Sequence, residues 1–545
     1  MESFDYLIIG AGSAGCVLAN RLSEDAGVKV CVVEAGGRDW NPYIHIPAGF
    51  IKTFYDKSVN WCYDQEPSHW TGGRRIFAPR GKTLGGSSSI NGNVFNRGQR
   101  MDFDTWAQMG NRGWSYPDIL PYFRRLERRI GAHDPLYRGN EGGLAVTDID
   151  WHHPLNEAFI EGCVSLGIPR NPDYNGTTQE GVSYTQRTIL NGRRASAATA
   201  FLRPAMSRAN LEVKMRLQAT QLVFEGKRVV GVQCRKGGPQ GPLVELRAKR
   251  EVILALGTYN TPQLLMLSGV GPQAQLQQHG IAVRHALAGV GEGLQDHYAP
   301  RFVARVKNIE TINEKSRGWK LALEIAKWAI ARRGILSLNP TLIYCFWHSG
   351  ATTERSDLQL TFTPASYKEG VQGELEDEPG MTVASWQQRP ESRGWVRLRS
   401  ADPFAPPVIQ PNYLVEETDR RVLLAGMKLA RRLLKTRPLE PYYEREDFPG
   451  PQVQTDDELL DAARQRGTTT FHPAGTCRMG PASDPTAVVD DQLCVHGLAG
   501  LRIIDASIMP RMISANLNAA TLMIAEKGSD LIRGKAAPEP ANLPQ

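Results

Sequence analysis

The sequence predicts an α/β protein in which a Rossmann-like domain is interleaved with a second domain. Residues 5–36 show the order strand, glycine-rich turn, helix and strand that begins such a domain. Apolar runs of strand length recur at 251–257 in the middle of the chain and at 501–505 near its end. A chain of 545 residues also exceeds what one simple core accommodates. Strands of one sheet thus come from distant segments, which indicates interleaved domains rather than consecutive ones.

The first elements are short and well marked. A strand at 6–9 precedes a turn at 10–15 and a helix at 17–22, and a second strand covers 30–33. Both strands are continuous apolar runs, which are typical of a parallel sheet covered by helices on both faces. We therefore expect the two strands in one parallel sheet.

Gly10, Gly12 and Gly15 form a GxGxxG turn, and Glu34 ends the next strand. In this context Gly10 makes the tight turn, Gly12 lets a pyrophosphate approach the backbone, and Gly15 allows close packing of the helix. Glu34 would accept hydrogen bonds from an adenosine ribose. The motif predicts a dinucleotide cofactor, and taken alone it also suits a nicotinamide dehydrogenase.

The later strands are each followed by a helix, at 262–267 and at 519–532. Between residues 40 and 145, Gly, Pro, Trp and Arg are frequent and long periodic segments are rare. We expect that region to form loops and short helices wrapped over a ligand.

The composition is that of a globular protein, with 41% hydrophobic and 22% charged residues. The net charge of +7 is modest, and Lys and Arg are scattered among acids, which disfavours nucleic-acid binding. The positive net charge is compatible with an anionic ligand or an anionic lipid surface.

The eight cysteines show no CxxC spacing and stand mostly among apolar neighbours. We interpret them as core residues in a reducing compartment and expect neither disulfides nor a metal site. Residues 1–5 contain no basic region followed by an apolar run, so we expect no secretory signal and a cytoplasmic location. Residues 536–545 are expected to form a disordered tail.

Residues 317–333 are a candidate basic amphipathic helix. Trp319, Leu323 and Ile330 recur at helical spacing, with Lys and Arg residues between them. The favoured interpretation is a surface helix whose apolar stripe packs on the core. The alternative is a peripheral contact with the inner membrane, near which a quinone would be reduced.

Two further motifs carry chemistry. Residues 81–92 are rich in Gly and Ser, which suits a loop against a polar ring or a phosphate. His472 lies in the run FHPAGT, where small residues leave space beside the imidazole. Asn516 and Asn518 precede a helix, and we expect one to cap the helix and the other to work in a pocket.

These motifs resemble those of the glucose-methanol-choline (GMC) oxidoreductases, flavoproteins that oxidise alcohols. The matching stretches are residues 10–34, 81–98, 257–272 and 471–521, in the family's order over nearly the whole chain. The resemblance implies an FAD-binding domain interleaved with a substrate domain of antiparallel sheet and helices. The implied segments are 1–154, 196–304 and 456–535 for the FAD domain, and 155–195 and 305–455 for the substrate domain.

The resemblance also implies the site residues. His472 and Asn516 would be catalytic. At the ADP half the cofactor contacts would be Gly10, Gly12, Ser13, Gly15 and Glu34, with Ala219 at the adenine. Gly85, Asn91 and Gly92 would lie along the flavin, and Asn518 and Thr521 near the pyrimidine end of its ring. Asp505 and Ala506 would lie near the ribityl chain and the pyrophosphate. Some members bind FAD covalently through a histidine at the position that is Ile90 here, so we expect non-covalent FAD.

The implied reaction is oxidation of a primary alcohol to the aldehyde. Hydride would pass to flavin N5 while His472, with a pKa near neutrality, accepts the hydroxyl proton and Asn516 orients the oxygen. The chain resembles bacterial FAD-dependent dehydrogenases of aliphatic alcohols, choline or ketose sugars such as sorbose, a likeness that includes residues 171–181. Alternatives are an oxygen-using oxidase of aromatic, heteroaromatic or sugar alcohols, a flavin-retaining lyase or photodecarboxylase, and a non-catalytic FAD-binding protein.

The sequence names neither the alcohol nor the electron acceptor, for which quinone and oxygen are both candidates. Specificity would lie in residues 305–455. That region holds several aromatic residues that could line a pocket or fill a core, and core is the favoured interpretation for most of them. They are Tyr344, Phe346, Trp347, Phe362 and Trp386.

Overall fold

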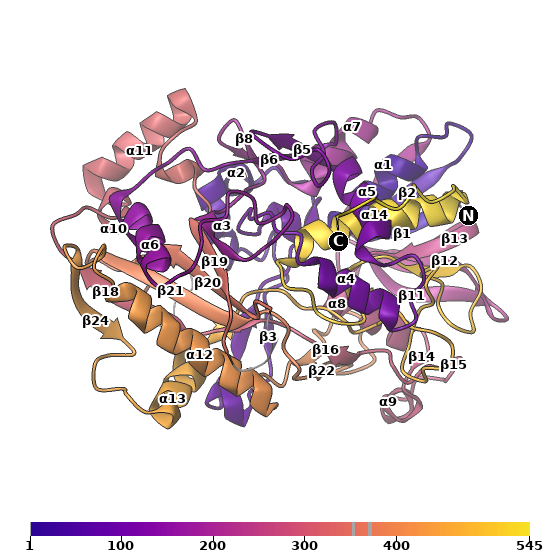
Figure 1. Cartoon of the computed structure of the whole chain (residues 1–545). Helices are drawn as coiled ribbons and strands as arrows, with labels where there is room; N and C mark the ends of the chain where they lie inside the picture. Colours follow the sequence, from indigo (N-terminus) through magenta and orange to yellow (C-terminus); the bar gives the residue numbers. More distant parts are fainter. Residues whose placement is uncertain (1, 351–354, 369–372, 545) are drawn as a thin grey trace.

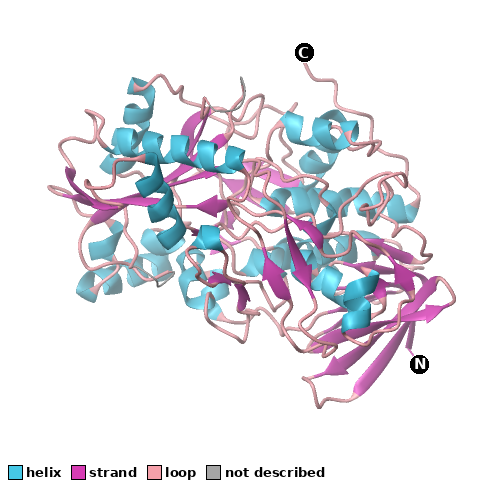
Figure 2. Cartoon of the chain, turned by 90° about the horizontal axis from the view of Figure 1, so that it is seen from below, coloured by secondary structure: helices cyan, strands magenta, loops and turns pink. Residues whose placement is uncertain are grey.

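The computed structural model describes residues 2–350, 355–368 and 373–544, and within them the chain forms two large sheets. A seven-stranded sheet lies on the right in Figure 1 and a six-stranded sheet on the left. Figure 2 shows the N-terminus beside the long strands at one end of the molecule. The predicted α/β architecture with a second, antiparallel domain is confirmed.

The seven-stranded sheet collects strands from across the chain. Its order is β10-β2-β1-β13-β12-β11, and β26 pairs with β13. The strands are β1 (Glu2–Ile9), β2 (Val30–Val33), β10 (Leu211–Lys214), β11 (Leu217–Glu225), β12 (Arg228–Lys236), β13 (Leu243–Leu254) and β26 (Leu501–Ile503). The early, middle and late strands predicted from sequence lie side by side and parallel. β11 and β12 add an antiparallel extension that the sequence reading did not predict.

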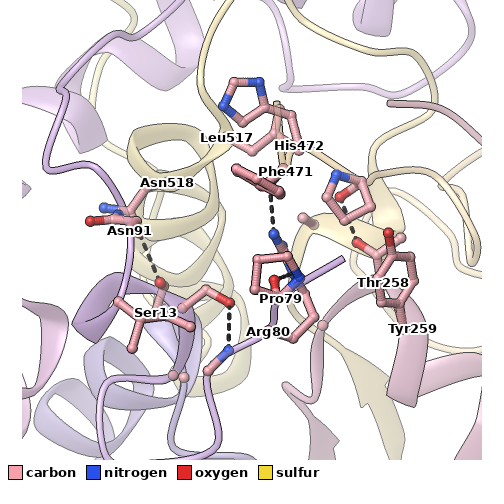
Figure 3. Close-up of a pocket in the computed structure, with 18 of the residues that line it drawn as sticks. Ser13, Pro79, Arg80, Asn91, Thr258, Tyr259, Phe471, His472, Leu517 and Asn518 are labelled. Carbon is pink, nitrogen blue, oxygen red and sulfur yellow. Dashed lines mark hydrogen bonds between the residues drawn. The ribbon is translucent and has the colours of Figure 1, made fainter. Parts of the chain in front are cut away.

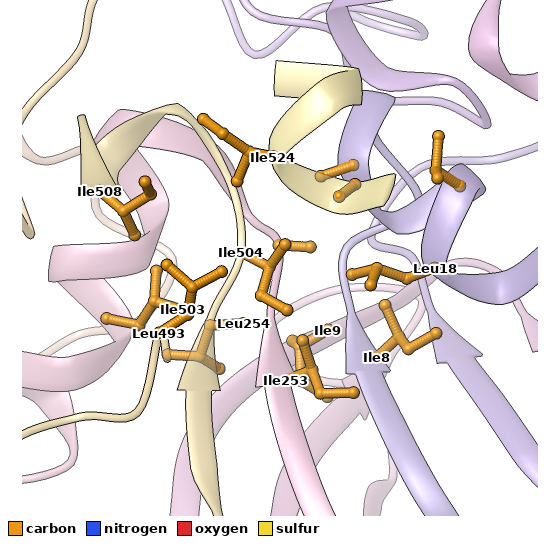
Figure 4. Close-up of a cluster of buried hydrophobic side chains, with 14 of the residues drawn as sticks. Ile8, Ile9, Leu18, Ile253, Leu254, Leu493, Ile503, Ile504, Ile508 and Ile524 are labelled. Carbon is orange, nitrogen blue, oxygen red and sulfur yellow. The ribbon is translucent and has the colours of Figure 1, made fainter. Parts of the chain in front are cut away.

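Helices cover this sheet and complete its core. They are α1 (Ser13–Leu22), α5 (Tyr116–Leu126), α8 (Gly257–Leu267) and α14 (Leu517–Arg533). Ile8, Ile253 and Ile503 are fully buried on neighbouring strands, and Leu18 and Ile524 pack over them from α1 and α14 (Figure 4). Segments about 500 residues apart therefore share one hydrophobic core, which is the interleaving that the sequence predicts.

The six-stranded sheet is antiparallel throughout, in the order β24-β18-β21-β20-β19-β7. Its strands are β7 (Gly181–Tyr184), β18 (Arg301–Val306), β19 (Ile343–Trp347), β20 (Leu358–Thr363), β21 (Gly380–Gln387) and β24 (Tyr443–Phe448). Helices α6 (Pro154–Ser165) and α12 (Glu417–Leu434) pack on one face. The apolar face of α12, with Val422, Met427 and Leu433, is fully buried there.

The region from 40 to 145 is mostly loop with short elements, as predicted. It contains α2 (Pro42–His45), α3 (Phe50–Thr53), β3 (Tyr63–Gln65), β4 (Ile76–Ala78), α4 (Arg100–Gln108), β5 (Glu127–Ile130) and β6 (Leu144–Thr147), besides α5. Residues 536–544 form no helix or strand, although Ala541 N–H donates to the Pro117 carbonyl (2.9 Å) and Ala541 packs against the larger core.

Helix α11 (Gly318–Ala331) corrects the favoured interpretation of residues 317–333. Trp319 is 69% exposed and Ile330 is 87% exposed, so the apolar stripe faces away from the core. The opposite face attaches the helix to the protein, because Glu324 accepts a hydrogen bond from Ile335 N–H and Trp328 Nε1 donates to the Gly192 carbonyl. Helical spacing identified the stripe but not the direction in which it points.

No helix in the described part of the chain is long and apolar enough to cross a membrane. All eight cysteines are free thiols, and six of them are buried.

Candidate cofactor and active site

One cavity of about 420 Å³ extends from the parallel strands of the first sheet to the open face of the antiparallel sheet. At one end it is lined by Gly10, Glu34 and Asp505, which follow the carboxyl ends of β1, β2 and β26. At the other end it is lined by Tyr344 and Ala384, from β19 and β21. Ligands in open α/β sheets bind at such carboxyl ends.

The glycine turn has the geometry that the motif predicts. Gly10 has a φ of +107°, and a Cβ there would lie 2.5 Å from the Ala255 carbonyl oxygen. A Cβ at Gly15 would lie 1.9 Å from the Gly10 carbonyl oxygen. Gly12 lines the cavity at the start of α1, where no side chain caps the helix. The N-terminus of α1 is therefore free to face an anionic group.

Two carboxylates shape the loops at this end. Glu34 accepts hydrogen bonds from the backbone N–H groups of Ala11 (2.9 Å) and Gly36 (2.8 Å). Asp505 accepts from the N–H of Gly257 and the hydroxyl of Thr261. Burial raises the pKa of both carboxyl groups. Each acid ties a strand end to a neighbouring loop while its side chain lines the cavity.

Most of the expected cofactor contacts line this cavity. Ser13 Oγ donates to Asn518 Oδ1 (2.8 Å), which joins α1 to α14 (Figure 3). Asn91 Oδ1 accepts from Arg194 (2.7 Å), which fixes the loop that carries it. The further expected residues that line the cavity are Gly92, Ala219, Ala506 and Thr521.

Gly85 is an exception among the expected flavin contacts. It is not among the lining residues, and its N–H donates to the Ala11 carbonyl (2.8 Å) behind the glycine turn. Gly15 also lies behind the cavity, as its predicted packing role requires. The backbone of Gly85 thus holds the loop against the glycine turn, and its contact with the flavin stays a prediction.

His472 and Asn516 meet at the boundary between the two halves of the cavity. Asn516 Nδ2 lies 2.9 Å from His472 Nε2, and Asn516 Oδ1 accepts from the Tyr344 hydroxyl (2.8 Å). Since Tyr344 supplies the proton to Oδ1, the amide nitrogen of Asn516 is the donor to His472. His472 Nε2 therefore carries a lone pair.

His297, which the sequence analysis did not single out, completes this chain of hydrogen bonds. Its Nε2 lies 2.7 Å from the Gln388 carbonyl oxygen, so Nε2 carries the proton of the neutral ring and Nδ1 is an acceptor. His297 Nδ1 lies 2.9 Å from His472 Nδ1. His472 thus donates from Nδ1, with the Thr470 hydroxyl 2.7 Å from the same nitrogen.

Burial keeps both imidazoles neutral. It lowers the pKa of His297 to about 4. The pKa of His472 is lowered well below its usual value, first by burial and then by His297 and Arg80. The expected near-neutral pKa of His472 is therefore wrong, because desolvation disfavours the charged form of the buried ring. His472 is therefore a neutral imidazole at neutral pH.

The loop that carries His472 is held in a strained shape. Phe471 adopts a left-handed backbone with a φ of +68°, which costs a non-glycine residue about 1–3 kcal/mol. Asp296 Oδ1 accepts from His472 N–H (2.8 Å), and the Thr469 hydroxyl donates to Asp296 Oδ2. Arg80 donates to the Phe471 carbonyl (Figure 3). These bonds fix where the imidazole points.

Neither asparagine caps α14 through its side chain, which corrects the expectation for this pair. Asn516 occupies the N-cap position without a side-chain capping bond, because its amide is used by His472 and Tyr344. Asn518 accepts from Ser13 instead.

Of the five aromatic residues considered, Tyr344 and Trp386 line the cavity, whereas Phe362 stacks on Phe159 in the core. Phe346 is buried against Tyr174, and Trp347 packs against the core of the six-stranded sheet.

One signal in the sequence could have identified His297. It ends the polar triplet Gln295-Asp296-His297, and a buried polar run of this kind is a hydrogen-bonded network.

Known proteins share this architecture. The GMC oxidoreductase family models match residues 4–299 and 390–525. An alcohol dehydrogenase [acceptor] of Pseudomonas putida is 40% identical over 97% of this chain and 95% of its own length. The mitochondrial choline dehydrogenase of Homo sapiens is 40% identical over 98% of this chain and 91% of its own.

Two solved structures are similar over nearly their full lengths. Pyridoxine 4-oxidase from Mesorbium loti has a TM-score of 0.86 at 29% identity, covering 98% of this chain and 100% of that one. A formate oxidase of Aspergillus oryzae, described for its FAD modification, has a TM-score of 0.90 at 26% identity and covers 98% of both chains. The free helix N-terminus, the strand ends and the polar loops fit an FAD in the cavity. This chain belongs to the GMC oxidoreductase family, and its cofactor is FAD.

Proposed function

We propose that the protein oxidises a primary alcohol to the aldehyde, with His472 as the general base. One observation carries the proposal: a neutral histidine presents the lone pair of Nε2 to the cavity beside the amide of Asn516. Alcohol dehydrogenases and oxidases are among the relatives and structural neighbours. When bound, FAD supplies the hydride acceptor.

The two side chains divide the work at the alcohol oxygen. When the alcohol binds, its hydroxyl replaces the hydrogen bond between the two side chains, donating to His472 Nε2 and accepting from Asn516 Nδ2. After the proton moves, both ring nitrogens of His472 carry hydrogen, and His297 Nδ1 still accepts from His472 Nδ1.

The test is anaerobic mixing of the holoprotein with primary alcohols while the visible flavin absorbance is followed. An alcohol oxidoreductase loses its oxidised-flavin spectrum, whereas a lyase, a photodecarboxylase or a non-catalytic flavoprotein keeps it. His472→Ala should bind FAD normally but bleach about 100- to 10,000-fold more slowly, a loss of about 3 to 5 kcal/mol of barrier lowering. Near-normal bleaching by this variant would remove His472 from the mechanism.

We also propose that FAD is held without a covalent bond. Covalent flavin links need a nucleophilic side chain beside the ring, such as histidine or cysteine. Among the described residues that line the cavity there is no cysteine, and His472 is the one histidine. Ile90, in the glycine- and serine-rich loop, lines the cavity with an unreactive side chain.

A peripheral membrane contact through α11 is the proposal for location, with a membrane quinone as the electron acceptor. Trp319, Leu323 and Ile330 form an exposed apolar face, and Lys320 and Lys327 flank it. This pattern suits the surface of an anionic bilayer. The turn at 335–337 that follows α11 leads to Pro340, which lines the cavity, so a lipid contact would lie on the substrate side.

The division into two domains is retained as a proposal. The seven-stranded sheet draws its strands from the segments assigned to FAD, and the six-stranded sheet draws most of its strands from 155–195 and 305–455. β18 begins at Arg301, four residues before the proposed boundary.

A further inference from the structure

Arg301 stands out among the charged side chains that line the cavity. They are Glu34, Arg80, Arg301 and Asp505. Both carboxylates belong to the nucleotide end, where backbone N–H groups already bind their oxygens. Among the described lining residues, the half of the cavity formed by the antiparallel sheet therefore has no carboxylate of its own.

Arg301 has no ion-pair partner in the described part of the chain. Burial lowers the pKa of its guanidinium, and the phenol of Tyr367 opposes that shift. Arg305, four residues further along β18, contrasts with it because Arg305 binds Glu376 (2.6 Å) and Asp447. A desolvated guanidinium without a counter-ion is costly unless a ligand supplies one.

The register of the sheet places Arg301 opposite the catalytic pair. Arg301 pairs with Ala384, Ala384 with Thr361, and Thr361 with Tyr344, and all four line the cavity. They form one row across β18, β21, β20 and β19, on one face, because directly opposed residues of antiparallel strands share a face (Figure 1). Tyr344, at one end of the row, binds Asn516.

The row also sets a length. Arg301 and Tyr344 are three strand spacings apart, which is about 14 Å between their backbones. The two positions between them, Ala384 and Thr361, carry small side chains that leave space above the sheet. Trp386 and Phe54 add apolar lining to the same cavity.

We propose that Arg301 binds the carboxylate of the substrate, and that the protein oxidises hydroxy acids whose primary alcohol lies several carbon atoms from the carboxylate. The alcohol end lies at His472 and Asn516, the carbon chain crosses the floor at Ala384 and Thr361, and the carboxylate pairs with the guanidinium. An α-hydroxy acid is too short to span the row. The ammonium group of an alcohol such as choline would be repelled by Arg301, and this half of the cavity has no described carboxylate to pair with it. This inference rests on the proposed alcohol oxidation and narrows its substrate class.

The experiment compares anaerobic flavin reduction by three substrates with the same six-carbon chain. They are 6-hydroxyhexanoate, its methyl ester and 1,6-hexanediol. For the unmodified holoprotein, the reduction rate constant divided by the dissociation constant should be about 10- to 100-fold higher for the hydroxy acid, as expected for a charge-assisted hydrogen bond. Choline should be the poorest substrate.

Two variants and a control locate the effect. Arg301→Met should lose the preference for the acid, while Arg301→Lys should keep part of it. Lys307→Met removes an exposed positive charge just beyond the same strand and should leave the preference intact. Hexanoate, which cannot be oxidised, should inhibit the unmodified protein about 10- to 100-fold more strongly than Arg301→Met, whereas hexanamide should inhibit both equally.

The outcomes separate the two proposals. If no alcohol bleaches the flavin, the proposed oxidation fails. If the diol bleaches it but the hydroxy acid is no better than its ester, the oxidation stands and the role of Arg301 is overturned. Equal hexanoate inhibition of the unmodified protein and Arg301→Met would overturn it too, and this measurement remains informative if Arg301→Met is slow with every substrate.

Discussion

His297 decides which nitrogen of His472 faces the cavity. A neutral imidazole has one donor and one acceptor nitrogen, and nothing in His472 itself selects between them. The Gln388 carbonyl fixes the proton of His297 on Nε2, so His297 Nδ1 must accept from His472. The lone pair of His472 is then confined to Nε2, beside Asn516. In the proposed mechanism His297 is a positioning residue, because it would act on the substrate only through His472.

Replacing His297 should change both the rate and its pH dependence. His297→Ala removes the acceptor and one cause of the lowered pKa of His472, so that pKa rises toward its usual value near 6.5. In the proposed reaction flavin reduction depends on neutral His472, so in the variant it should decline at a higher pH as the solution is made acidic. We expect the rate at neutral pH to fall about 10- to 100-fold.

The matched variant is His297→Gln, whose amide can accept from His472 and donate to Gln388. It should recover part of the rate lost in His297→Ala. Stopped-flow reduction between neutral and acidic pH measures both effects. An acid limb at the same pH in the unmodified protein and in His297→Ala would contradict this role.

At the scale of one element, the turn into α1 separates packing from cofactor binding. Gly15 faces the backbone, with no space for a Cβ beside the Gly10 carbonyl, whereas a Cβ at Gly12 would meet no atom nearer than 3.8 Å. Both glycines belong to one motif, yet their neighbours differ.

Two alanine substitutions should therefore have different effects. Gly15→Ala should destabilise the fold by roughly 3 kcal/mol or more, because the backbone must move. Gly12→Ala should leave the stability of the apoprotein nearly unchanged but weaken FAD binding, because its methyl group enters the cavity. Denaturant unfolding of the apoproteins and FAD titration test this pair, and equal destabilisation by both substitutions would contradict it.

Helix α11 is the element whose role depends on the direction of its apolar face. The double variant Trp319→Ser, Ile330→Ser should reduce binding to phosphatidylglycerol vesicles by at least tenfold, since each side chain contributes about 2 kcal/mol on burial. Leu243→Ser is the matched control, because Leu243 is 54% exposed on the other domain. Co-sedimentation measures binding. Undiminished binding by the double variant, or no binding by the unmodified protein, would exclude α11 as a membrane contact.

At the scale of the whole molecule, the FAD site is assembled from distant segments. Gly10, Glu34, Ala219 and Asp505 all line one end of the cavity. A cofactor that touches all of these segments binds only the folded state, because the segments are far apart in the unfolded chain. Binding therefore stabilises the folded protein.

Acid precipitation should release all of the flavin into the supernatant, because the proposed binding is non-covalent. The FAD-free protein should also unfold at a temperature several degrees lower, and added FAD should restore the transition in a concentration-dependent way. Absorbance of the supernatant and thermal unfolding check the two effects. Flavin that remains with the precipitate would show a covalent bond.

The parts of this protein that depend on short segments could be predicted from the sequence alone. The glycine turn, the buried strands and the helices after them follow from local spacing. The apolar runs at 6–9, 251–257 and 501–505 were enough to predict that these strands share one sheet. His472 and Asn516 were also identifiable, because each lies in a motif that resembles a known family. Motifs of this kind can be recognised from a few consecutive residues.

The contacts between these segments could not be predicted from the sequence, because they depend on long-range packing. The bond from His297 to His472 joins residues 175 positions apart, and the row from Arg301 to Tyr344 depends on the pairing of four strands. Periodicity showed that Trp319 and Ile330 share a face of α11 but could not show that the face points outward. Local pattern fixes which side chains lie together on an element, whereas long-range packing fixes what lies opposite them and thus their burial, their pKa and their chemistry.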